Sequence, residues 1–209
     1  MSFLNEIIFI GNYLHMIMYK FKCFLLIFCS IVLMIAFFFV SYIKIAFPIA
    51  YNNEITCACL EFGVDESLVR AIINVESGYD ELAISRVGAK GLMQIMPETA
   101  KYIAHQMKIK DFEEKMLFDS KINIRMGTFY LRYLFDKYND LNLVLFAYNA
   151  GEGRLNEYLE NKTVLSVENI EIVETRNYIQ RVTRQLDIYE RLYKITKTAS
   201  FRAVFLFFI

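Results

Sequence analysis

The strongest constraint on the fold is an uncharged apolar run at residues 23–43, made mainly of Leu, Ile, Phe, Val and Met. A run of about 20 apolar residues is long enough to cross the hydrocarbon core of a bilayer as a helix. A cleaved secretory signal is the alternative, but residues 47–50 offer no clear Ala-x-Ala cleavage site. We therefore expect an uncleaved transmembrane anchor at residues 23–43.

Basic residues flank this run unevenly, since Lys20 and Lys22 precede it and Lys44 follows it. Cytoplasmic flanks carry the excess of Lys and Arg. We expect a cytoplasmic N-terminus and an external domain. The predicted division is an apolar N-terminal segment at 1–22, the anchor at 23–43, a linker at 44–53, one helical domain at 54–198 and an apolar tail at 199–209.

Charge and cysteine content exclude some classes of function. The 209-residue chain has 23 basic and 23 acidic residues, a formal net charge of +0, and no basic stripe, so nucleic acid is not an expected partner. Of its 4 cysteines, Cys23 and Cys29 lie in the apolar run, and Cys57 and Cys59 lie too close in sequence for an unstrained disulfide. No cysteine-to-histidine spacing indicates a zinc site, and we expect neither a metal nor a cofactor.

After the linker, apolar residues recur at helical spacing, and no stretch alternates as a strand in a sheet does. The predicted fold class is therefore all-α. Helices are expected at residues 54–60, 65–77, 97–107, 119–138, 141–148 and 174–195. The expected inward face of the helix at 119–138 consists of Ile122, Met126, Phe129, Tyr130, Tyr133 and Leu134.

The helix at residues 65–77 carries a candidate catalytic acid. Asp65 suits its N-cap and Gly78 its C-terminal stop. Val69 and Glu76 then share one face, so the carboxyl lies on the inward stripe. A carboxyl among apolar neighbours loses hydration in its charged form, which raises its pKa and lets it act as a general acid near neutral pH. The alternative is a glutamate at the edge of the stripe that turns toward solvent.

Several separated motifs surround this acid in a fixed order. Glu76-Ser77 is followed by Ala-Ile-Ser at 83–85, GLMQIMPETA at 91–100, AYNAG at 147–151, VENI at 167–170 and ETRNY at 174–178. Together they resemble the lytic transglycosylases of the soluble-lytic-transglycosylase (SLT) type, which belong to the lysozyme-like superfamily. The resemblance covers roughly residues 54–193.

This resemblance implies a lysozyme-like helical domain that follows an N-terminal transmembrane helix in the bacterial inner (cytoplasmic) membrane, with the domain on its outer side. The implied reaction is non-hydrolytic cleavage of the β-1,4 bond between MurNAc and GlcNAc in peptidoglycan, which leaves 1,6-anhydro-MurNAc ends. Glu76 would first donate a proton and then accept one. The implied partners are the glycan strand, the membrane and secretion or wall-remodelling machinery.

The resemblance also assigns substrate-binding positions. Carried over residue by residue, these positions are Ser85, Gln94, Met96, Tyr148, Asn149 and Glu174. Without the resemblance, Ser85 is a turn residue, Met96 fills the core and Glu174 is an acid favoured near a helix N-terminus.

Two rival functions remain from the sequence. A hydrolytic muramidase of the goose type would use the same fold but release reducing ends, and an inactive peptidoglycan-binding or assembly module would be expected to lack Glu76, which is present. The chain also departs from the family after Gly151, where Glu152-Gly153 replaces the usual proline, and a looser turn is expected there.

Overall fold

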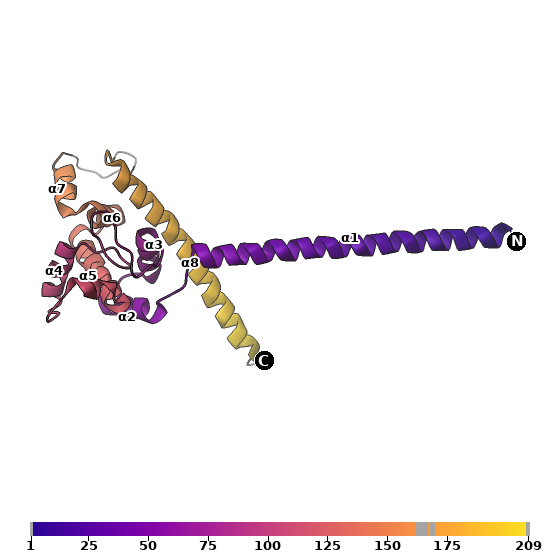
Figure 1. The fold of residues 1–209 in the computed structure, drawn as a ribbon, viewed down its shortest axis with the longest axis horizontal. Coiled ribbons are helices and arrows are strands. Elements are labelled where there is room, and N and C mark those ends of the chain that lie inside the picture. The colour runs from indigo at the N-terminus through magenta and orange to yellow at the C-terminus, as the bar shows by residue number, and fades with distance from the viewer. Residues whose placement is uncertain (1, 162–166, 168–169, 208–209) are drawn as a thin grey trace. The chain divides into compact units, whose positions relative to one another are not determined.

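The computed structural model describes residues 2–161, 167 and 170–207, and it describes side chains at residues 9–43, 45–160, 167 and 170–194. The chain divides into two compact units, Met1–Pro48 and Ile49–Ile209. The first unit consists of one helix, α1 (Ser2–Ala46), whose stretch Phe9–Ile43 is long and apolar enough to cross a membrane (Figure 1). The apolar helix is thus longer than the predicted span at 23–43, because residues 9–19 are also free of charge.

In the residues that the structure describes, the second unit consists of helices joined by loops, the longest of which separates α3 from α4. Isolated bridges join Ile84 to Lys90 and Lys90 to Ile95, and the described part of the unit has no strand. The all-α prediction is therefore confirmed. Its elements are α2 (Asn52–Phe62), α3 (Glu66–Ser77), α4 (Pro97–Gln106), the 3₁₀ helix η1 (Glu114–Phe118), α5 (Ser120–Tyr138), α6 (Leu141–Ala150), α7 (Glu152–Asn161) and α8 (Val173–Phe207).

Side-chain caps explain where the predicted helices begin. The Asp65 carboxylate accepts a hydrogen bond from the Leu68 backbone at 3.1 Å, and Gly78 ends α3 at a φ of 60°. Asp119 caps α5 in the same way, by accepting from the backbone of Ile122 at 2.9 Å. Each carboxylate satisfies a backbone N–H that has no partner within its helix.

The core lies where α3 packs against α8 and α2 packs against α5. The predicted inward face of α5 is partly wrong, since Phe129 and Tyr133 are only partly buried while Ile124 and Leu131 are fully buried. Because α5 contacts α2, α4 and α6, it buries more of its circumference than one stripe.

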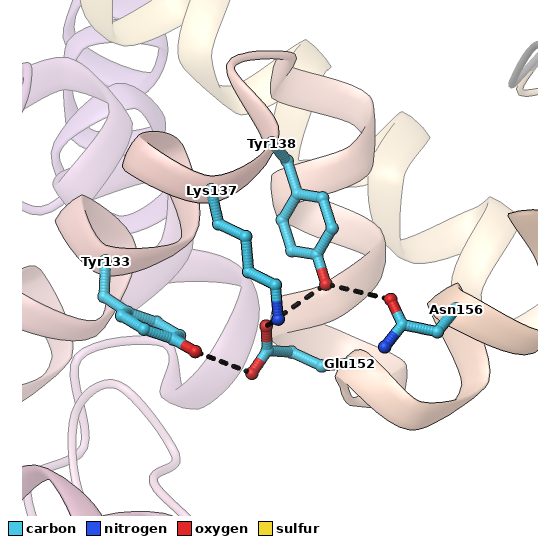
Figure 2. Close-up of polar contacts among 5 residues, drawn as sticks. All are labelled: Tyr133, Lys137, Tyr138, Glu152 and Asn156. Carbon is cyan, nitrogen blue, oxygen red and sulfur yellow. Dashed lines mark hydrogen bonds and ion pairs between the residues drawn. The ribbon is translucent and has the colours of Figure 1, made fainter.

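A helix that the sequence pattern did not predict, α7, begins directly after Gly151. Instead of loosening the turn, Glu152 stands in the first turn of α7, where a carboxylate is favoured by the helix dipole. Its carboxylate accepts hydrogen bonds from Lys137 at 2.6 Å, Tyr138 at 3.1 Å and Tyr133 at 3.2 Å (Figure 2). This residue therefore ties α7 to α5.

The last helix is longer than predicted. Where the pattern predicted a helix at 174–195 and a separate tail at 199–209, α8 runs without a break from Val173 to Phe207. Residues 208–209 lie outside the described part of the chain, as do Glu168 and Asn169 of the VENI motif.

Candidate active site

Glu76 lies in the last turn of α3, just before the glycine that ends the helix. Its side chain is partly buried, and burial raises the pKa of its carboxyl to about 7. Tyr178 and Arg181, both on α8, oppose that rise because they stabilise the charged form. The expected rise in pKa is confirmed, and a carboxyl with this pKa is divided between its acid and base forms near neutral pH.

Two tyrosines lie close to this carboxyl. Tyr148 comes from α6 and Tyr178, only 2 % exposed, from α8. Burial raises the pKa of both hydroxyls, and the negative charge of Glu76 raises it further, so both remain protonated donors. The Tyr148 hydroxyl donates to the Met93 carbonyl at 2.8 Å. The Tyr178 hydroxyl acts on Glu76 electrostatically, although no hydrogen bond of standard geometry joins them.

The loop that contains Met93 is held in a constrained shape by Gln94. Gln94 has a φ of 47°, a conformation that costs a non-glycine residue free energy unless its surroundings fix it. Its side-chain amide donates to the carbonyl oxygens of Gly91 at 2.8 Å and Ala83 at 3.1 Å. Both amide hydrogens are thus used within the loop, and only the amide oxygen is left to accept a hydrogen bond from a ligand.

Asn123, fully buried on α5, anchors the same loop and was missed by the sequence analysis. Its side-chain oxygen accepts from the Met93 backbone at 2.8 Å, and its amide donates to the carbonyls of Lys90 at 3.0 Å and Leu117 at 2.8 Å. A buried amide with all these bonds made fixes the position of the backbone around it. The signal that could have found it is an asparagine on the same helical face as the buried residues Met126 and Gly127.

The remaining predicted substrate-binding residues differ in their exposure and in the hydrogen bonds that their side chains make within the protein. The Ser85 hydroxyl accepts from the Ala89 backbone at 2.9 Å, which fits a turn residue. Asn149 accepts from the Thr175 hydroxyl at 3.0 Å and so joins α6 to α8. Met96 is 36 % exposed at the start of α4, and Glu174 is exposed in the first turn of α8.

The structure therefore brings some of the predicted residues together and leaves others apart. Tyr148 lies within electrostatic reach of Glu76, and through Met93 it contacts the loop that carries Gln94. Ser85 belongs to the same loop system through Ala83 and Ala89. Neither Met96 nor Glu174 is among the described groups that shift the pKa of Glu76. The described residues contain no group of three or more metal-ligating side chains.

The model of the family "Transglycosylase SLT domain" matches residues 54–170, which is more than half of the chain. The chain belongs to the SLT transglycosylase domain family. The fold agrees, since lytic transglycosylase Slt from Pseudomonas aeruginosa, solved as an inactive Glu-to-Gln mutant, superposes with a TM-score of 0.68 and 33% sequence identity over 73% of this chain and 26% of that one.

Two kinds of curated relative resemble this SLT domain. The soluble lytic murein transglycosylase of Salmonella typhimurium is 36% identical over 73% of this chain and 25% of its own length. The membrane-bound lytic murein transglycosylase C of Shigella sonnei is 34% identical over 68% of this chain and 40% of its own. The chain therefore spans about a quarter of the soluble relatives that it matches.

Proposed function

We propose that this SLT domain is a peptidoglycan lytic transglycosylase that cleaves the MurNAc–GlcNAc β-1,4 bond without water and leaves 1,6-anhydro-MurNAc ends. The observation that carries the proposal is Glu76, a partly buried carboxyl whose pKa is raised to about 7, within reach of the hydroxyls of Tyr148 and Tyr178. Relatives of both kinds are named lytic murein transglycosylases, which supports the same reaction class.

In the proposed first step, protonated Glu76 donates its proton to the glycosidic oxygen as the bond to C1 of MurNAc breaks. Positive charge develops at C1 and the ring oxygen, and the new Glu76 carboxylate stabilises it. In the second step, the carboxylate takes the proton of the C6 hydroxyl of the same sugar while O6 bonds to C1. Glu76 ends protonated, as it began, and no water is consumed.

A single carboxylate in this role agrees with the surroundings of Glu76. Most glycosidases divide the work between two carboxyl groups. Burial shifts the pKa of Glu76 most, followed by Tyr178 and Arg181, and no carboxylate of the residues that the structure describes contributes to the shift. This favours the transglycosylase over the goose-type muramidase, which was the closer rival.

The other site residues are proposed to hold the sugar. Gln94 offers its amide oxygen to a sugar hydroxyl, since both its hydrogens are used within the loop. Tyr148 is proposed to face the reacting sugar, with its hydroxyl set by the Met93 carbonyl. Ser85, Met96, Asn149 and Glu174 are proposed to line the rest of the glycan-binding surface.

For location, we propose that α1 anchors the protein as a single span in the bacterial inner membrane with the SLT domain outside the cytoplasm. The length and composition of α1 and the membrane-bound relatives support an association with the membrane. The orientation depends on the excess of Lys20 and Lys22 over Lys44 at its flanks. A secretion or wall-remodelling assembly is proposed as the partner outside.

The test is digestion of purified peptidoglycan by the full chain in mild detergent, with mass spectrometry of the muropeptides. Products one water lighter than reducing sugars identify the transglycosylase, and reducing ends identify the hydrolase. Glu76→Gln is expected to abolish product formation. The matched control is Glu81→Gln, an exposed glutamate in the next loop, which is expected to keep full activity. Digestion by Glu76→Gln at the parent rate would overturn the proposal.

A further inference from the structure

The last turns of α8 have a composition that the proposed chemistry does not use. Residues 203–209 are apolar without exception, and three of these seven residues are phenylalanines. The preceding residues 191–202 carry four basic residues and no acidic residue. The helix continues through this stretch to Phe207 (Figure 1). We call residues 191–209 the α8 end, in which a basic part is followed by an apolar part.

The α8 end begins beside the segment that joins the domain to α1. A recess of about 410 Å³ lies where that segment meets α8, and the residues that line it there are Ile49, Tyr189, Leu192 and Tyr193. Ile49 is the first residue of the second unit, and it follows the last residue of the apolar stretch of α1, Ile43, by six residues. Six residues of chain span at most about 20 Å. These turns of α8 therefore lie close to the point where the chain leaves the proposed membrane span.

Arg70 fixes the joining segment to the domain. Its buried guanidinium, on α3, donates to the Ala50 carbonyl at 3.3 Å and to the side-chain oxygen of Asn52 at 2.9 Å. Hydrogen bonds from a charged donor are among the stronger ones in proteins. Because α3 in turn packs against α8, the joining segment and α8 keep their places relative to each other.

The surface of a lipid bilayer suits both parts of the α8 end. Membranes that contain anionic lipids attract clusters of Lys and Arg. Apolar side chains of a surface helix enter the boundary between headgroups and acyl chains. Seven helical residues rise about 10 Å, whereas the hydrocarbon core is about 30 Å thick. Residues 203–209 are therefore long enough to enter this boundary and too short to cross the membrane.

We propose that the α8 end is a second attachment to the membrane, in which residues 203–209 enter the lipid surface while Lys197 and Arg202 contact anionic headgroups. This inference rests on the proposed location, with α1 in the same membrane. Because α8 also carries Tyr178 beside Glu76, the attachment limits how far the acid reaches from the membrane. The helix rises about 38 Å between Tyr178 and residue 203. The enzyme then acts on the glycan strands nearest to the membrane.

The experiment uses the absence of tryptophan from the chain, so that a single introduced tryptophan reports its own surroundings. Phe205→Trp places this probe in the α8 end, and Tyr102→Trp, at a position on α4 that is 43 % exposed, is the matched control. The full chain is placed in vesicles of phosphatidylglycerol and phosphatidylethanolamine, with or without brominated acyl chains, which quench tryptophan only at close range. We expect brominated lipid to remove most of the emission of Phe205→Trp and to leave that of Tyr102→Trp unchanged.

The role of the basic residues is tested in the Phe205→Trp background. Lys197→Gln is expected to lower the ratio of quenched to unquenched emission about fivefold, the effect of one basic residue near an anionic surface. Vesicles of phosphatidylcholine, which has no net charge, are expected to give weaker quenching than the anionic vesicles. Equal quenching in the two kinds of vesicle would overturn the proposed contact with anionic headgroups.

Flotation of the chain with the vesicles is recorded in the same samples. A chain that floats, but whose Phe205→Trp emission is unaffected by brominated lipid, would overturn the second attachment and leave the α1 anchor standing. This holds also if the emission shifts to shorter wavelength, since the α8 end is then buried against protein, in its own domain or in a second copy. A chain that does not float would refute the anchor and the second attachment together. Release of anhydro products tests the proposed reaction separately.

Discussion

The sharpest prediction concerns the cost to stability of keeping Glu76 partly buried. In the folded protein the pKa of its carboxyl is raised from 4.5 to about 7. Each unit of pKa difference between the folded and unfolded states corresponds to about 1.4 kcal/mol. Glu76 therefore favours folding by ~3 kcal/mol more when it is protonated than when it is charged.

The sign follows from proton binding. Between pH 4.5 and about 7 the folded state holds the Glu76 proton while the unfolded state has released it, so the free energy of unfolding decreases as pH rises. The contribution is fully present below the unfolded pKa, is lost as pH rises through the folded value, and is gone above it. Glu76→Gln has no proton to lose and keeps its stability across this range.

We therefore expect Glu76→Gln to match the parent at about pH 4.5 and to be more stable by ~3 kcal/mol at about pH 8. The measurement is urea unfolding of the full chain in mild detergent, followed by the fluorescence of its 14 tyrosines, because the chain has no tryptophan. Glu81→Gln, at an exposed position, is the control and should follow the parent at both pH values. A gain that is equal at both pH values, or a loss at high pH, would refute the reasoning.

Three further substitutions test how the loop beside Glu76 is held, each by urea unfolding and by the rate of anhydro-product release. Asn123→Ala leaves the Met93 N–H without its partner, and we expect it to lower the free energy of unfolding by about 3 kcal/mol. Its exposed control, Asn156→Ala, should change the free energy of unfolding by less than about 0.5 kcal/mol. Gly127→Ala places a methyl group 2.4 Å from the Met93 sulfur and should lower the free energy of unfolding by about 1–3 kcal/mol. Its control, Gly153→Ala, places the methyl group in open space on a helix and should raise the free energy of unfolding by up to about 1 kcal/mol. Tyr148→Phe removes the donor to the Met93 carbonyl, and we expect it to lower the free energy of unfolding by about 1 kcal/mol and to reduce the rate of product release. A variant as stable and as active as the parent would show that this hydrogen bond contributes to neither.

Local signals were enough to predict several helices. The carboxylate of Asp65 and the glycine at position 78 define α3, and its apolar stripe predicts correctly that the Glu76 carboxyl is partly buried with a raised pKa. The extended length of α1 and the whole of α7 were not predicted. Residues 152–161 are mostly polar, and α7 is held by the contacts of Glu152 with α5, which a local pattern does not contain.

The site was harder to predict than the helices because it depends on distant contacts. Periodicity places Tyr178 on the inward face of α8, but it does not show that this face meets the end of α3. The role of Asn123 depends on backbone groups of Met93 and Lys90, about thirty residues earlier in the chain. Such partners are fixed only when the helices have packed.

The packing of α8 on α3 has a consequence for the newly made chain. Tyr178, one of the groups beside Glu76, comes from α8, which is synthesised well after α3 (Figure 1). Until that helix docks, the Glu76 carboxyl keeps its hydration shell, so it is mostly ionised at neutral pH and cannot serve as the proposed general acid. A copy in which α8 has not yet docked on α3 therefore lacks the environment that raises the pKa of Glu76.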